Sequence, residues 1–81
     1  MRHAAAMTAA SVDVRDMLCA QAIQVAWKAA RALPVGAVLE TVCNAQDVKE
    51  DLIIWARELG YQLLAEETRA DEIWLWIQTG R

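Results

Sequence analysis

The chain has 81 residues, of which 57% are apolar, so it is long enough for one small domain with a core of limited size. Its formal net charge of -3 offers no positive field for a phosphate backbone, which argues against nucleic acid as a partner. Two cysteines, Cys19 and Cys43, are too few for the disulfide framework of a small secreted domain, so we expect reduced thiols and a cytoplasmic location.

Residues 1–11 are predicted to form a disordered tail ahead of a single domain at residues 12–81. The tail lacks the strongly apolar core of about 7–15 residues that a secretory signal requires. His3 in this tail has no second candidate ligand nearby, so we expect no metal site there. No stretch of the chain reaches the roughly 18 apolar residues that cross a bilayer, and we expect no membrane partner.

The first half of the domain is predicted to contain a strand, a helix and a second strand. Val12–Arg15 alternates apolar and polar residues, as a short strand does. Ala20–Leu33 places apolar residues at helical spacing, with polar residues opposite; the apolar set is Ile23, Ala26, Trp27, Ala30 and Leu33. Pro34 and Gly36 end this helix, and the run Ala37–Cys43, rich in β-branched residues, predicts the second strand.

The second half is predicted to contain a helix followed by a hairpin. Asp47 and Glu50 have the spacing of a helix N-cap and its reciprocal glutamate, and Gly60 is the natural end of that helix. Tyr61–Glu66 and Glu72–Gln78 are predicted strands joined by a polar turn. The order βαβαββ predicts an α+β fold, a two-layer sandwich with both helices on one face of a four-stranded mixed sheet, because each helix has only one apolar stripe to bury.

The last predicted strand carries apolar side chains on both of its faces. Ile73, Leu75 and Ile77 alternate with Trp74 and Trp76. We assign the aliphatic set to the helices, which leaves the two indoles on the uncovered face. There they are either a docking surface for a partner or a second copy of the chain, or are merely covered by the tail.

Cys19 stands where the first strand leads into the first helix, a place where a helix N-terminus favours the thiolate. Val12-Asp13, Leu18-Cys19, Gly36 before a strand and Gly60-Tyr61-Gln62-Leu63-Leu64 together resemble the TusA/SirA family of small sulfur-carrier proteins. The resemblance covers nearly everything except the tail. It implies that Cys19 accepts sulfane sulfur as a persulfide from a cysteine desulfurase or rhodanese-like donor and passes it to a protein acceptor, with no metal or organic cofactor.

The most specific motif of that family is incomplete here. Family members carry Cys-Pro-x-Pro, and Ala20 and Ala22 stand in place of the two prolines. Asp16-Met17 replaces a Gly-Leu pair before the cysteine, and Asn44-Ala45-Gln46 replaces an Asp-Pro signal after the second strand. Two interpretations follow: a sulfurtransferase-type carrier that uses Cys19, or a non-catalytic binding or regulatory module in which Cys19 is inert.

Cys43 closes the second predicted strand and is a candidate second thiol. In this fold the end of that strand lies near the start of the first helix, so Cys43 either pairs with Cys19 in a redox or relay step or is a small buried strand residue. Asp13 and Asp16, close to Cys19 in sequence, disfavour its thiolate, while Arg15 offsets one of them. The sign of the net effect on the pKa of Cys19 stays open at this point.

Overall fold

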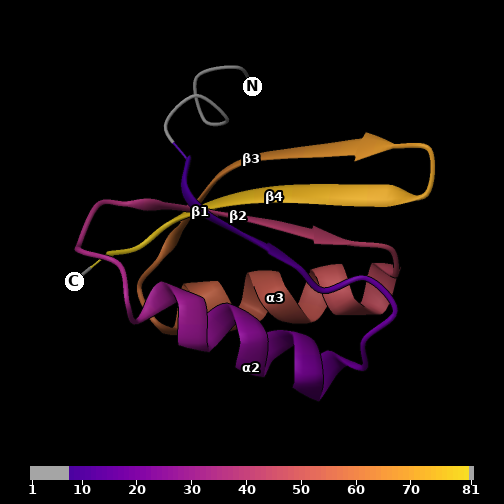
Figure 1. Cartoon of the computed structure of the whole chain (residues 1–81), viewed down its shortest axis with the longest axis horizontal. Coiled ribbons are helices and arrows are strands. Elements are labelled where there is room, and N and C mark those ends of the chain that lie inside the picture. Colours follow the sequence, from indigo (N-terminus) through magenta and orange to yellow (C-terminus); the bar gives the residue numbers. More distant parts are fainter. Residues whose placement is uncertain (1–7, 81) are drawn as a thin grey trace.

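The computed structural model describes residues 8–80, which form one four-stranded sheet and two helices. The elements are β1 (Thr8–Asp13), α2 (Cys19–Ala30), β2 (Val38–Cys43), α3 (Gln46–Glu58), β3 (Gln62–Arg69) and β4 (Glu72–Gln78). The strand order is β1-β2-β4-β3, with β1 and β2 parallel and the other neighbouring pairs antiparallel. Figure 1 shows α2 and α3 together on one side of the sheet, so the predicted two-layer sandwich is confirmed.

The first strand begins earlier than the sequence predicts. β1 runs over Thr8–Asp13 and pairs in parallel with β2, Ser11 opposite Glu40 among others. The prediction of residues 8–11 as tail is wrong: small residues such as Ala9 and Ala10 have low strand propensity, but pairing with an inner strand of the sheet overrides that preference. The rest of the predicted tail, residues 1–7 with His3, lies outside the described residues.

The helix α2 packs on the sheet through a row of small side chains. Its buried residues are all alanine, namely Ala22, Ala26 and Ala30. These alanines and Leu52 of α3 share the core with Leu39 of β2 and with β4. The contribution of β4 is the aliphatic set Ile73, Leu75 and Ile77, which confirms its assignment to the helix-covered face.

One polar group in the centre of the sheet has no hydrogen-bond partner. Thr41 on β2 is fully buried, and its Oγ1 contacts no acceptor or donor among residues 8–80. Burying a hydroxyl without a partner destabilises the folded state, because the group has given up its bonds to water.

Replacing Thr41 with Val keeps the side-chain shape and removes that hydroxyl. We expect the T41V variant to gain about 1 kcal/mol in free energy of unfolding, measured by urea denaturation with an unchanged m value. The T41S variant is the matched control, since it keeps the hydroxyl, loses a methyl group and should be destabilised. A loss of stability in T41V would contradict this account.

Candidate functional site

Cys19 is the first residue of α2 and its side chain is partly exposed. The backbone of the preceding Leu18 is extended, with φ -71° and ψ 159°, and Leu18 is 74% exposed. The backbone N–H of Leu18 donates to Oε1 of Gln21 at 3.0 Å, which closes the first helical turn. The structure therefore places the thiol at a helix N-terminus that solvent can reach.

The start of α3 lies beside this thiol. In Figure 1 both helices begin at the edge where β1 and β2 end, so the β1–α2 and β2–α3 connections are neighbours. The pKa of Cys19 rises to about 11, first because the nearby Asp51 carboxylate favours the protonated thiol, then because of burial and of repulsion by Asp51 and Asp47. The sign that the sequence left open is therefore upward, because acidic side chains of α3 and burial favour the protonated thiol.

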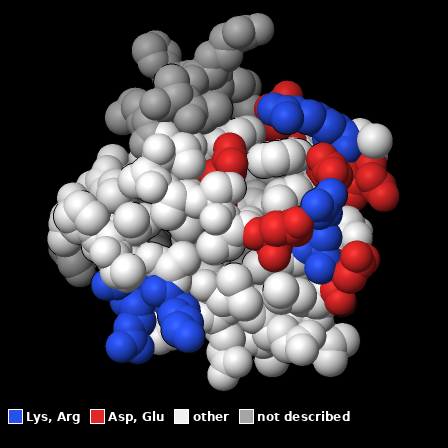
Figure 2. Space-filling view, in the orientation of Figure 1, with Lys and Arg blue, Asp and Glu red and all other residues white. Residues whose placement is uncertain are grey.

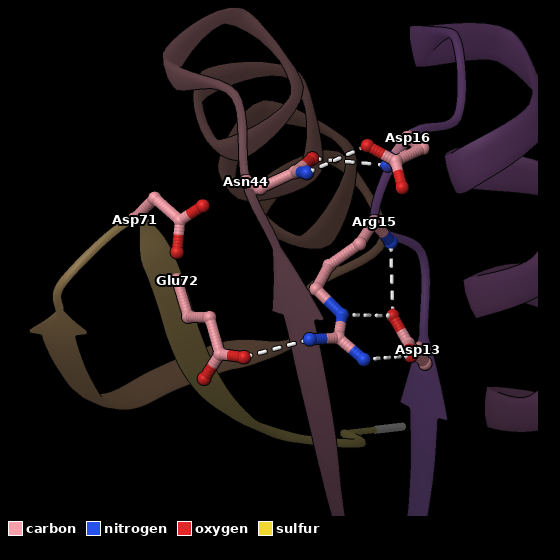
Figure 3. Close-up of a pocket in the computed structure, with 6 residues that line it drawn as sticks. All are labelled: Asp13, Arg15, Asp16, Asn44, Asp71 and Glu72. Carbon is pink, nitrogen blue, oxygen red and sulfur yellow. Dashed lines mark hydrogen bonds and ion pairs between the residues drawn. The ribbon is translucent and has the colours of Figure 1, made fainter.

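The carboxylates that raise the pKa of Cys19 are not those of Asp13 and Asp16, which are closest to it in sequence. Arg15 donates to both Asp13 oxygens, from Nε at 2.9 Å and from Nη2 at 2.7 Å, and this pairing lowers the pKa of Asp13 to about 2. Nη1 of Arg15 reaches Glu72 at 2.7 Å. Figure 3 shows these groups with Asp16, Asn44 and Asp71 around an open polar cavity of about 420 Å³. Proximity in the fold, through α3, decides which acids act on Cys19.

The alanines that replace the family's prolines have different surroundings. Ala22 is fully buried, and its N–H donates to the Leu18 carbonyl at 2.9 Å. A proline at this position has no N–H and would lose that bond. Alanine at position 22 thus adds a hydrogen bond to the first turn of α2.

Cys43 is fully buried at the end of β2. Its Sγ donates to the Ala45 carbonyl at 3.9 Å, and burial raises the pKa of its thiol. In this conformation a partner's sulfur has no access to Cys43, so packing accounts for its placement. Its pairing with Cys19 in a redox or relay step stays a prediction.

Trp74 and Trp76 lie on the sheet face opposite the helices, but they are not two free indoles. Trp76 is only 1% exposed, and its indole N–H donates to Oε2 of Glu40 at 2.9 Å. Trp74 is half-buried and stacks on Trp76, with ring centroids 6.3 Å apart and planes 19° apart. The Arg69 guanidinium lies 5.0 Å from the Trp74 ring centroid. The prediction of a paired exposed surface is therefore wrong for Trp76, and only Trp74 is left partly accessible.

An aromatic group that the sequence pattern assigned to the core is exposed instead. Trp27 on α2 is 39% exposed, and the Arg31 guanidinium lies 5.8 Å from its ring centroid. Gln24, Trp27, Lys28 and Arg31 line a shallow hollow of about 410 Å³. Figure 2 shows a group of basic side chains over the C-terminal half of α2, apart from the mixed acidic and basic groups across this face. Trp27 lies at the margin of the apolar stripe of α2, so its indole is partly exposed and does not enter the core.

Residues 8–80 offer neither a membrane-crossing helix nor a candidate metal site. Neither helix in this part of the chain combines the length and apolar character needed to cross a membrane. These residues also contain no group of three or more His, Cys, Asp or Glu side chains placed to hold a metal ion. The predicted absence of a metal role for His3 concerns a residue outside this range.

The chain is similar to known proteins in sequence and in fold. Residues 10–79 match the model of the family described as sulfurtransferase TusA. The chain is 30% identical over 69 residues to a candidate sulfur carrier protein, YrkI, of Bacillus subtilis (strain 168), a match that covers 85% of this chain and 92% of that protein. The crystal structure of a SirA-like protein from Desulfitobacterium hafniense has the same fold, with a TM-score of 0.78 at 23% identity over 89% of this chain and 99% of that one. The chain belongs to the TusA sulfurtransferase family, as the residues around Cys19 predicted.

Replacing Asp51 with Asn should accelerate alkylation of Cys19. The substitution removes the carboxylate that contributes most to raising the pKa of Cys19 to about 11. Well below a thiol's pKa, each unit by which that pKa falls increases the thiolate fraction about tenfold. We expect D51N to react with iodoacetamide about tenfold faster near pH 8 and to shift the rate–pH profile to lower pH.

Glu50→Gln is the matched control for this experiment, because it removes the same charge from the same turn of α3. We expect its rate–pH profile to stay close to that of the unmodified protein. A D51N profile that coincides with the E50Q profile would mean that Asp51 does not control the Cys19 thiol.

Proposed function

We propose that this protein is a sulfur carrier that relays sulfane sulfur as a persulfide on Cys19, between a protein donor and a protein acceptor. The observation that supports this most directly is a partly exposed thiol at the N-terminus of α2, in a chain of the TusA sulfurtransferase family. Protein partners follow from that role, since a carrier must meet both a source and a recipient of sulfur. A cysteine desulfurase or rhodanese-like enzyme is the donor class that we propose.

The transfer is a thiol–disulfide-type exchange that needs no net oxidant or reductant. The Cys19 thiolate attacks the outer sulfur of the donor's persulfide; an S–S bond forms to Cys19 as the donor's S–S bond breaks, and the donor cysteine leaves as a thiolate. The Cys19 proton ends on that leaving thiolate or on solvent. In the second step an acceptor nucleophile attacks the outer sulfur and Cys19 leaves in turn.

The carboxylates beside Cys19 affect both steps. A thiol with a raised pKa is mostly protonated, but its thiolate is a stronger nucleophile once formed, and it is a poorer leaving group. Poor leaving ability keeps the acquired sulfur on Cys19 until an acceptor docks. The raised pKa therefore suits a carrier that must hold its cargo between partners.

A binding or regulatory module with an inert Cys19 is the second candidate function. It is favoured by the same raised pKa, which leaves little thiolate at neutral pH, and by Ala20 and Ala22 in place of the family's prolines. Such a module would bind partners through its surface while taking up no sulfur. Sulfur loading separates the two candidates.

The Cys19→Ser and Cys43→Ser variants test the carrier. After incubation with a cysteine desulfurase and cysteine, we expect intact-mass spectrometry to show one added sulfur atom on the wild-type protein and on C43S. We expect none on C19S. Far-UV circular dichroism checks that both variants are folded. Loading that persists in C19S would contradict the assignment, and a complete absence of loading with retained partner binding would favour the inert module.

We also propose that the sheet face opposite the helices, which carries Trp74 and Trp76, binds a partner or a second copy of the chain. Single substitutions of the two tryptophans test this proposal. Replacing Trp76 with Thr removes a buried indole and its bond to Glu40, so we expect a loss of about 3–5 kcal/mol in free energy of unfolding. Replacing the half-buried Trp74 with Thr should cost clearly less and should weaken partner binding or a homodimer if this face is an interface. Urea denaturation and sedimentation velocity measure the two effects. Equal destabilisation by both substitutions would show that Trp74 serves packing alone.

A further inference from the structure

A reciprocal hydrogen-bonded pair joins the two loops on either side of the proposed sulfur site. The Asp16 backbone N–H donates to Oδ1 of Asn44 at 2.9 Å, and Nδ2 of Asn44 donates to Oδ1 of Asp16 at 2.8 Å. Figure 3 shows the two side chains facing each other, Asp16 from the β1–α2 loop and Asn44 from the end of β2. Asn44 thus forms hydrogen bonds with both the backbone N–H and the side-chain carboxylate of Asp16.

The backbone of Asp16 has an unusual conformation for which this pair compensates. Its φ is 63°, in the left-handed region that glycine adopts readily and other residues adopt at a cost. Aspartate is among the residues that tolerate this region, provided that its short polar side chain finds a local hydrogen bond. The Asn44 amide supplies such a bond from a different loop. The turn that leads into α2 therefore depends on a residue outside it.

The pair lies at the junction of the elements that surround Cys19. Asp16 precedes Cys19 by three positions, and Met17 between them packs against the core. Asn44 directly precedes Ala45, the N-cap of α3, the helix that carries Asp51. The two hydrogen bonds consequently tie the start of α2 to the start of α3.

We propose that Asn44 is a positioning residue for the sulfur site, which holds the left-handed turn at Asp16 and thereby keeps the Cys19 thiol against the Asp51 carboxylate. The proposal rests on the proposed function of Cys19, but it concerns the environment of the thiol and can be tested without any sulfur transfer. Asn44 acts through Asp16 and touches no reacting atom. Loss of its side chain frees the turn, so the thiol spends less time beside the Asp51 carboxylate and ionises more readily.

The test is the rate–pH profile of Cys19 alkylation by iodoacetamide in the full chain, with Cys19 followed by peptide mass spectrometry. We expect Asn44→Ala to shift the profile to lower pH and to raise the rate near pH 8 at least about threefold, the rise that half a unit of pKa produces. The exchange Asp16→Asn with Asn44→Asp keeps one carboxylate and one amide with their roles reversed. We expect this double variant to stay within a factor of about two of the unmodified protein.

A second double variant keeps the test decisive if N44A folds poorly. Glycine adopts a positive φ without help, so Asp16→Gly combined with Asn44→Ala should fold and should return the profile towards that of the unmodified protein. An unchanged profile in folded N44A, a shifted profile in the exchanged pair, or unfolding of D16G/N44A would each overturn the proposal. Sulfur loading of the unmodified protein is scored separately, so failure of the positioning role is distinguishable from failure of the carrier.

Discussion

The parallel pairing of β1 with β2 determines where every group of the proposed site lies. Parallel strands end at the same edge of a sheet, so the helix that follows each of them begins at that edge. Cys19 at the start of α2 and Asp51 in α3 are consequently neighbours, although α2, β2 and the first turn of α3 separate them in sequence. The alanine row of α2 permits this crossover to lie close to the sheet, because side chains of that size leave little space between helix and strands.

This placement sets two electrostatic effects against each other at one sulfur atom. The N-terminus of α2 favours negative charge there, as it does for reactive thiols generally, while Asp51 and Asp47 disfavour it and raise the pKa of the thiol. A docked partner that brought a positive group to these carboxylates would weaken their effect on the thiol. Arg15 cannot provide that relief within the chain, since Asp13 and Glu72 already hold its guanidinium. The charge balance at Cys19 is therefore open to change by a partner, in a way that a thiol without acidic neighbours would not be.

Much of the fold could be predicted from local patterns, and the reasons for the misses are physical. Alternation along β4 correctly placed Leu75 towards the helices, but alternation says which face a side chain occupies and not what fills the space around it. The burial of Trp76 depends on Val38 and Glu40 of β2 and on Ala65 of β3, which approach it only when the sheet is assembled. The same limit applied at Cys19: Asp13 and Asp16 are close in sequence, whereas Asp51 is close in space. The shared edge of two parallel strands was the one sequence-level signal that could have pointed to α3.

The replaced prolines show how a family site can be rebuilt from hydrogen bonds. A proline ring fixes its backbone by covalent geometry, independently of any neighbour. Here the first turn of α2 is held by the bonds from Ala22 to the Leu18 carbonyl and from Leu18 to Gln21, and the turn before it by Asn44. Each hydrogen bond of this kind contributes modestly to the stability of the turn. It can break, whereas the restraint of a proline ring is covalent. If Asn44 positions the turn as proposed, the conformation around Cys19 depends on the β2–α3 loop, whereas a proline ring in the same turn would act independently of that loop.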